Sequence, residues 1–137
     1  MSLNTFHPAY FEVRFRGEAI PERWPEQFAV ITAYATTGEQ WSLAENIAAD
    51  QRLLRQIMDR GLWHLRLTGY SPHDGHAEPG WATRLSLEES CQLGRAFHQD
   101  AIFWISDDEL WVVKCDEPTT AVKVGLFPER LDHAPQP

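Results

Sequence analysis

Three histidines are the residues in this sequence that are best suited to holding a metal ion. His73 and His76 lie in the polar stretch 71–80, and His98 follows further along the chain. Together with Glu78 they offer the nitrogen and oxygen ligands that zinc and other divalent metals accept. Their spacing matches no established metal-binding signature, and the Pro, Asp and Gly residues of the same stretch equally suit a solvent-exposed turn. Both interpretations stay open.

Five polar residues are predicted to bind a ligand. Ser42 and Asn46 open a predicted helix, whose free N–H groups favour an anion or a carbonyl oxygen. Capping alone explains Ser42, but Asn is a mediocre helix former, so Asn46 favours a binding role. Gln99 and Asp100, between a predicted helix and a strand, suit either helix-end hydrogen bonding or a ligand. Glu78 and Asp100 could form an acid–base pair. The predicted positions are Ser42, Asn46, Glu78, Gln99 and Asp100.

Nucleophilic catalysis is not indicated by any motif. The sequence has no GxSxG motif and no phosphate-binding glycine loop, and no Ser/His/Asp or Cys/His triad can be argued from it. Cys91 lies in a predicted amphipathic helix, where burial would make its thiol inert, and Cys115 lies at a strand end. No catalytic residue is predicted, and the question of enzymatic activity stays open.

The pattern of apolar residues predicts the elements that position these side chains. Two capping boxes, Ser42-Leu43-Ala44-Glu45 and Ser86-Leu87-Glu88-Glu89, mark helix starts. In the first helix Leu43, Ile47, Leu54, Ile57 and Met58 follow at helical spacing, and Gly61 supplies the stop. The expected strands cover residues 10–16, 28–35, 62–70, 81–85, 101–105, 110–115 and 121–127.

The order of elements predicts an α+β fold. From residue 28 to 105 it is strand, helix, strand, strand, helix, strand, the split β-α-β-β-α-β arrangement of a ferredoxin-like core. An N-terminal strand and one or two C-terminal strands add to that core. The 137 residues form a single domain by the usual length prior, with a core of about 9–128 and loose termini at 1–6 and 132–137.

The direction of the chain predicts where a site lies. If each element crosses the full height of the sheet, the first helix begins at the same pole where the hairpin after Tyr70 turns and the second helix ends. This pole would collect the candidate residues named above: Ser42, Asn46, His73, His76, Glu78, His98, Gln99 and Asp100.

Three stretches resemble the family of small bacterial proteins grouped as domain of unknown function 3293. They are Ile31–Tyr34 followed by Ser42–Asn46, then Glu78 ahead of Trp81, and Leu93–Ile105. The resemblance implies a shared fold unit and places recurrent polar residues at the same pole, but it implies no reaction. The sequence departs from the family pattern where an Asn-Pro step is Ala35-Thr36, a Gly is His98 and an Asn is Asp100. Those departures would alter any site formed there.

Charge excludes some classes of partner. With 20 acidic and 12 basic residues the formal net charge is −8, which is repelled by phosphate backbones and anionic membrane surfaces. Two cysteines without CxxC spacing fit reducing conditions, so we expect a cytoplasmic protein. Both faces of the strand 101–105 are apolar, and the N-terminal strand or a second copy of the chain in a homodimer would cover the second face.

Three hypotheses about function follow. The leading one is a binding domain for a small polar ligand or a protein partner, without a cofactor. The first alternative is a metal-dependent hydrolase-like enzyme using zinc or a similar ion at His73, His76, His98 and Glu78. The second alternative is a purely structural interaction module.

Overall fold

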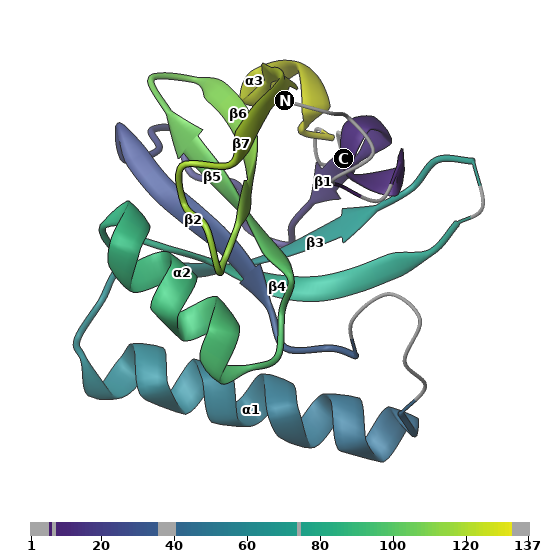
Figure 1. Ribbon diagram of the computed structural model, residues 1–137, viewed down its shortest axis with the longest axis vertical. Coiled ribbons are helices and arrows are strands. Elements are labelled where there is room, and N and C mark those ends of the chain that lie inside the picture. Colours follow the sequence, from purple (N-terminus) through teal and green to yellow (C-terminus); the bar gives the residue numbers. More distant parts are fainter. Residues whose placement is uncertain (1–5, 7, 36–40, 74, 133–137) are drawn as a thin grey trace.

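A single antiparallel sheet of seven strands organises the protein in a computed structural model, which describes residues 6, 8–35, 41–73 and 75–132. The strands follow the order β1-β3-β4-β2-β5-β6-β7, and the sheet curls into a half-barrel (Figure 1). Their bounds are β1 Arg14–Arg16, β2 Gln27–Thr32, β3 His64–Tyr70, β4 Ala77–Thr83, β5 Ala101–Ser106, β6 Glu109–Lys114 and β7 Ala121–Leu126. The helices are the 3-10 helix η2 (Pro8–Glu12), α1 (Leu43–Asp59), α2 (Leu87–Ala96) and α3 (Phe127–Arg130).

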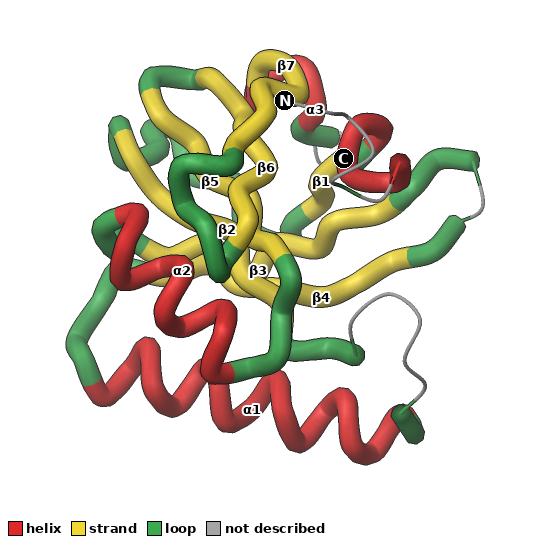
Figure 2. Tube along the Cα trace, in the orientation of Figure 1, coloured by secondary structure: helices red, strands yellow, loops and turns green. Residues whose placement is uncertain are grey.

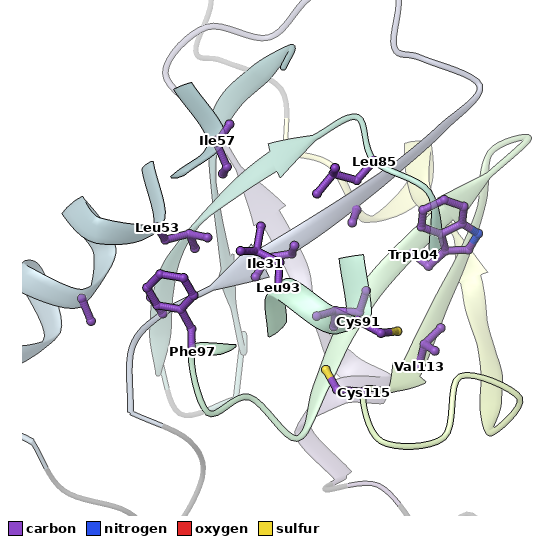
Figure 3. Close-up of a cluster of buried hydrophobic side chains, with 14 residues drawn as sticks. Ile31, Leu53, Ile57, Leu85, Cys91, Leu93, Phe97, Trp104, Val113 and Cys115 are labelled. Carbon is purple, nitrogen blue, oxygen red and sulfur yellow. The ribbon is translucent and has the colours of Figure 1, made fainter. Parts of the chain in front are cut away.

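The two longer helices, α1 and α2, lie on one side of the sheet (Figure 2). Between them and the strands is a core of aliphatic and aromatic side chains around Ile31, Leu53 and Leu93 (Figure 3). Cys91 and Cys115 are buried free thiols in this core, as predicted for small apolar residues. None of the helices in the described part of the chain is both long and apolar enough to traverse a bilayer.

A second core fills the inner side of the curl. Phe15, Phe28 and Phe127 are fully buried there, and their rings meet at centroid distances of 5.4–5.6 Å. Trp24 stacks on Phe28 at 5.1 Å. The short helices η2 and α3 contact β7 beside this core. Aromatic burial on this scale supplies much of the driving force for folding.

The ferredoxin-like prediction is wrong. The additional N-terminal and C-terminal strands were predicted, but all seven strands form one antiparallel sheet, and this sheet curls into a half-barrel instead of forming a separate four-stranded ferredoxin-like core. The curl lets the sheet cover its own second face with the aromatic core. The predicted strands 28–35 and 101–105 are apolar on both faces, which indicates that both faces of the sheet are buried. This pattern does not reveal that the second face is buried by the curling of the sheet itself.

Leu131 and Asp132, the last described residues, lie against β1. Phe15 bridges to Leu131 in parallel, and the backbone N–H of Asp132 donates to the Phe15 carbonyl at 2.8 Å. Arg14 pairs with the Asp132 carboxylate at 2.7 Å, and Tyr70 donates to the same carboxylate. These contacts hold the C-terminal segment across one edge of the half-barrel. Phe6, near the other end of the chain, is also buried.

The N-terminal strand is shorter than predicted. Residues 10–16 were expected to form one strand, but Pro8–Glu12 is a 3-10 helix and only Arg14–Arg16 pairs with β3. Arg130 accounts for part of the change, since its Nη1 donates to the carbonyls of Phe11 and Val13 at 3.1 Å. A C-terminal side chain therefore uses carbonyls that a strand partner would otherwise take.

Both capping boxes are confirmed. Ser42 accepts from the backbone N–H of Glu45, and the Glu45 side chain accepts from the backbone N–H of Ser42 at 3.0 Å. Ser86 and Glu89 repeat this exchange at the start of α2. Each box satisfies N–H groups that the helix itself leaves unpaired.

The buried face of α1 differs from the predicted one. Leu43, Ile47 and Met58 are 67%, 43% and 57% exposed, although their spacing predicted an inward stripe. The helix is rotated so that its core face consists of Ala49, Asp50, Leu53 and Ile57. Asp50 lies on this inward face, where Arg66 of β3 pairs with its carboxylate.

Candidate functional site

Two predicted binding residues converge on the segment that follows β2. The Asn46 Oδ1 accepts from the backbone N–H of Ala35 at 2.9 Å, and the Gln99 Nε2 donates to the carbonyl of Tyr34 at 2.8 Å. Gln99 is 8% exposed and also donates to the Phe97 carbonyl. These contacts hold the backbone of Tyr34 and Ala35, directly after β2. A role of Asn46 and Gln99 in ligand binding stays a prediction.

Ser42 and Asp100 lie at exposed ends of elements. The hydroxyl of Ser42 is engaged in the capping box of α1. Asp100 has an exposed side chain, and its carbonyl accepts from the backbone N–H of Cys115 at 2.9 Å. His98 follows α2 with a φ of 60°, a left-handed conformation that suits glycine at a helix C-terminus. The resemblance noted above places a glycine at this position, which backbone geometry explains.

Glu78 faces the inner side of the curl rather than the helices. Burial raises its pKa above the ordinary value, and the His76 imidazole, 3.5 Å away, opposes that rise. Burial also raises the pKa of the Tyr10 hydroxyl, and the nearby charge of Glu78 adds to the effect. Glu78 and Tyr10 are therefore electrostatically coupled.

Asn46 of α1 and Gln99 after α2 meet at the segment that follows β2, whereas the hairpin of β3 and β4 continues past this point. β2 pairs with β4 only as far as Thr32 and Gly80, whereas β3 and β4 continue to pair as far as Tyr70 and Ala77. The hairpin overshoots by three residue pairs, about 10 Å at the usual strand rise. In Figure 1 the hairpin of β3 and β4 extends away from α2, past the end of β2.

The three histidines are not brought together. His73 pairs with Glu12 at 3.0 Å near the hairpin tip, His76 pairs with Glu78, and His98 ends α2. Among the residues that the structure describes, no group of three or more His, Cys, Asp or Glu side chains could hold a metal ion. Asp74, between the first two histidines, lies outside the described residues. The metal site stays a prediction without a described ligand set.

A groove lies between α1 and the strands β3 and β4. Its volume is about 470 Å³, within the usual range for small-molecule sites. Both α1 and the strands contribute apolar and polar side chains to its lining. The lining residues are Glu18, Tyr34, Ile47, Asp50, Gln51, Leu54, Arg66, Thr68, Pro79 and Trp81.

A buried ion pair forms part of the groove. Arg66 Nη1 and Nη2 donate to the two carboxylate oxygens of Asp50 at 2.7 and 2.6 Å, in a bidentate pair. Trp81 Nε1 donates to Asp50 at 3.1 Å, and the Arg66 guanidinium lies 3.9 Å from the centroid of the Trp81 ring. The Asp50 side chain is 8% exposed and that of Arg66 32%. Three donors and one aromatic face therefore hold the pair rigidly.

Arg66 keeps one edge of its guanidinium available. Of its five N–H donors, two bind Asp50 and a third binds the carbonyl of Gly80 at 3.3 Å. The remaining donors are the Nε–H and one Nη2–H, which lie on the same edge. No residue that the structure describes accepts from them. This edge has the geometry that binds a carboxylate through two parallel hydrogen bonds.

The sequence interpretation missed this site. Neither Asp50 nor Arg66 nor Trp81 was predicted as a binding residue. A signal was present, because Asp50 lies three and seven residues before Leu53 and Ile57 and therefore shares their helix face. Its partner, 16 residues away in the sequence, could not be identified from spacing.

Comparison with known proteins yields one match. The model of a family described as "Protein of unknown function (DUF3293)" matches residues 31–102. No curated protein and no solved structure matches the chain. The matched region holds Asp50, Arg66 and Trp81, and it also holds all eight residues first predicted to bind a ligand or a metal. Because the match covers more than half of the 137 residues, the chain belongs to the DUF3293 family of proteins of unknown function.

Proposed function

We propose that this protein is a binding domain for a small ligand carrying a carboxylate, held in the groove by Arg66. The observation that carries the proposal is the unused Nε–Nη2 edge of a guanidinium whose other edge is fixed by Asp50. Because the guanidinium is already ordered, a ligand loses little binding energy to side-chain ordering. The two buried free cysteines fit the reducing cytoplasm, where we propose the protein acts.

The groove wall supports a ligand with an apolar part. Ile47 and Leu54 of α1 and Pro79 of β4 line it with carbon. A carboxylate on Arg66 would place the rest of a small molecule against these side chains, where burial of apolar surface adds to affinity. Thr68 and Gln51 offer further hydrogen-bonding groups in the same lining.

NMR spectroscopy with matched ligands tests the proposal. Carboxylates of four to six carbons are titrated against the primary amides of the same chains, and the Arg66 Nε–H resonance is followed. Carboxylates are expected to shift that resonance, because they accept from the free edge, and amides are expected to bind at least tenfold more weakly. Equal binding of acids and amides, or no shift with any acid, would refute the proposal.

Two variants separate the charge of Arg66 from its shape. Arg66→Lys keeps the cation but loses the planar fork, and it should weaken carboxylate binding about tenfold. Arg55→Lys, an exposed position on α1, is the matched control and should bind as the parent protein does. Circular dichroism of both variants confirms that they are folded. Unchanged affinity of a folded Arg66→Lys variant would contradict the assignment.

A further inference from the structure

We infer that the ligand is a zwitterion, an apolar amino acid or a short apolar peptide, whose carboxylate binds Arg66 and whose ammonium group faces Glu18. This inference rests on the proposed function and specifies its ligand class. It is carried by the distribution of charge in the groove lining, which contains one cation and two carboxylates.

The charges in the groove do not balance. Asp50 and Arg66 neutralise each other, and Asp50 accepts three hydrogen bonds. Glu18 is the remaining charged residue of the lining, and no ion pair joins it to a described cation within 4.0 Å. A simple anion entering the groove would therefore meet an uncompensated negative charge. A ligand that also carries an ammonium group would compensate it.

The backbone before Glu18 is held against the strand that carries Arg66. A Cβ on Gly17 would lie 3.2 Å from the Arg66 carbonyl and 3.3 Å from the Leu67 Cδ1. The segment after β1 thus packs closely on β3 at this point. Glu18, the exposed residue that follows Gly17, is part of the groove lining, together with Asp50 and Arg66.

The apolar wall suits the body of such a ligand. Ile47 lines the groove and is 43% exposed, so its carbon surface is accessible to a ligand. Leu54 is on the same helix face, about two turns further along. An aliphatic side chain between the two ligand charges would cover both residues. The matching ligand is therefore one apolar molecule that carries both an ammonium group and a carboxylate.

Calorimetric titration with four probes tests the inference. L-leucine and leucyl-leucine carry both charges, N-acetylleucine lacks the ammonium, and leucinamide lacks the carboxylate. At least one zwitterion is expected to bind about fivefold more tightly than N-acetylleucine, the gain typical of one exposed ion pair. Whether leucine or leucyl-leucine binds more tightly distinguishes a single amino acid from a peptide.

The outcomes separate this inference from the proposed function. Equal binding of leucine, leucyl-leucine and N-acetylleucine would overturn the zwitterion and leave carboxylate binding standing. Leucinamide binding as tightly as leucine would overturn both, as would the absence of binding by all four probes.

A charge variant provides the second readout. Glu18→Gln should abolish the preference, so that the zwitterion and N-acetylleucine bind with about equal affinity. The affinity for N-acetylleucine itself should not fall. Glu22→Gln, an exposed residue in the same segment, is the matched control and should keep the fivefold preference. A preference that survives Glu18→Gln would overturn the role of Glu18.

Discussion

Removal of the Asp50 carboxylate is the perturbation that most directly tests the groove. Asp50→Ala leaves Arg66 without its bidentate partner and the Trp81 N–H without an acceptor. Breaking a buried ion pair costs about 3–5 kcal/mol. Arg66 is 32% exposed and can regain hydration, so the lower end of that range, about 3 kcal/mol, applies. The lost Trp81 hydrogen bond adds about 1 kcal/mol.

The expected loss of unfolding free energy is therefore about 3–4 kcal/mol, after a gain of about 0.5 kcal/mol from the helix propensity of alanine. Urea denaturation followed by far-ultraviolet circular dichroism measures it at neutral pH. Asp59→Ala is the matched control, because Asp59 is an exposed acidic residue of the same helix. It should change stability by no more than about 0.5 kcal/mol.

A double-mutant cycle gives the sharper result. Arg66→Ala leaves the Asp50 carboxylate buried and unpaired, so each single variant loses the same interaction. The double variant should lose at least about 2 kcal/mol less than the sum of the two single variants. Additive losses, or an Asp50→Ala variant no less stable than Asp59→Ala, would refute the view that this pair is a rigid structural unit.

Three further outcomes are expected. His98→Gly should raise the unfolding free energy by about 0.5–1 kcal/mol, because glycine accepts the left-handed backbone that His98 adopts. His98→Ala should not raise it, and thermal denaturation of both variants measures the difference. Gly94→Ala should lower stability by about 1–2 kcal/mol in urea, because a Cβ there would lie 2.7 Å from the Cys115 Sγ. The raised pKa of Glu78 means that its stabilising contribution is present below its ordinary pKa of 4.5 and is lost as the pH rises through the folded-state value. Glu78→Gln should therefore gain stability relative to the parent protein as the pH rises from 4 to 7, and a constant difference in pH-dependent urea melts would contradict this.

The local elements of the fold were predictable because their signals are local. Ser42 with Glu45, and Ser86 with Glu89, are three residues apart and act within one helical turn. The strand at 101–105 is marked by a short run of apolar and β-branched residues. In each case the residues that decide the structure are neighbours in the sequence.

The curl and the groove were not predictable, because their causes are separated in sequence. The overshoot of the β3–β4 hairpin depends on where β2 stops pairing, which the hairpin residues do not encode. The rotation of α1 depends on Arg66, since Asp50 alone would be expected to face solvent. The shortening of the N-terminal strand depends on Arg130, more than 110 residues away.

The junction between β1 and the C-terminal segment has a consequence for how the chain folds. The inner core is sealed only when Leu131 and Asp132 reach Phe15, so residues near both ends of the sequence must be available together. Contacts between such distant residues slow folding, because a long loop must close before they form. During synthesis the helix-covered layer can assemble first, whereas the aromatic interior stays incomplete until Leu131 and Asp132 have left the ribosome.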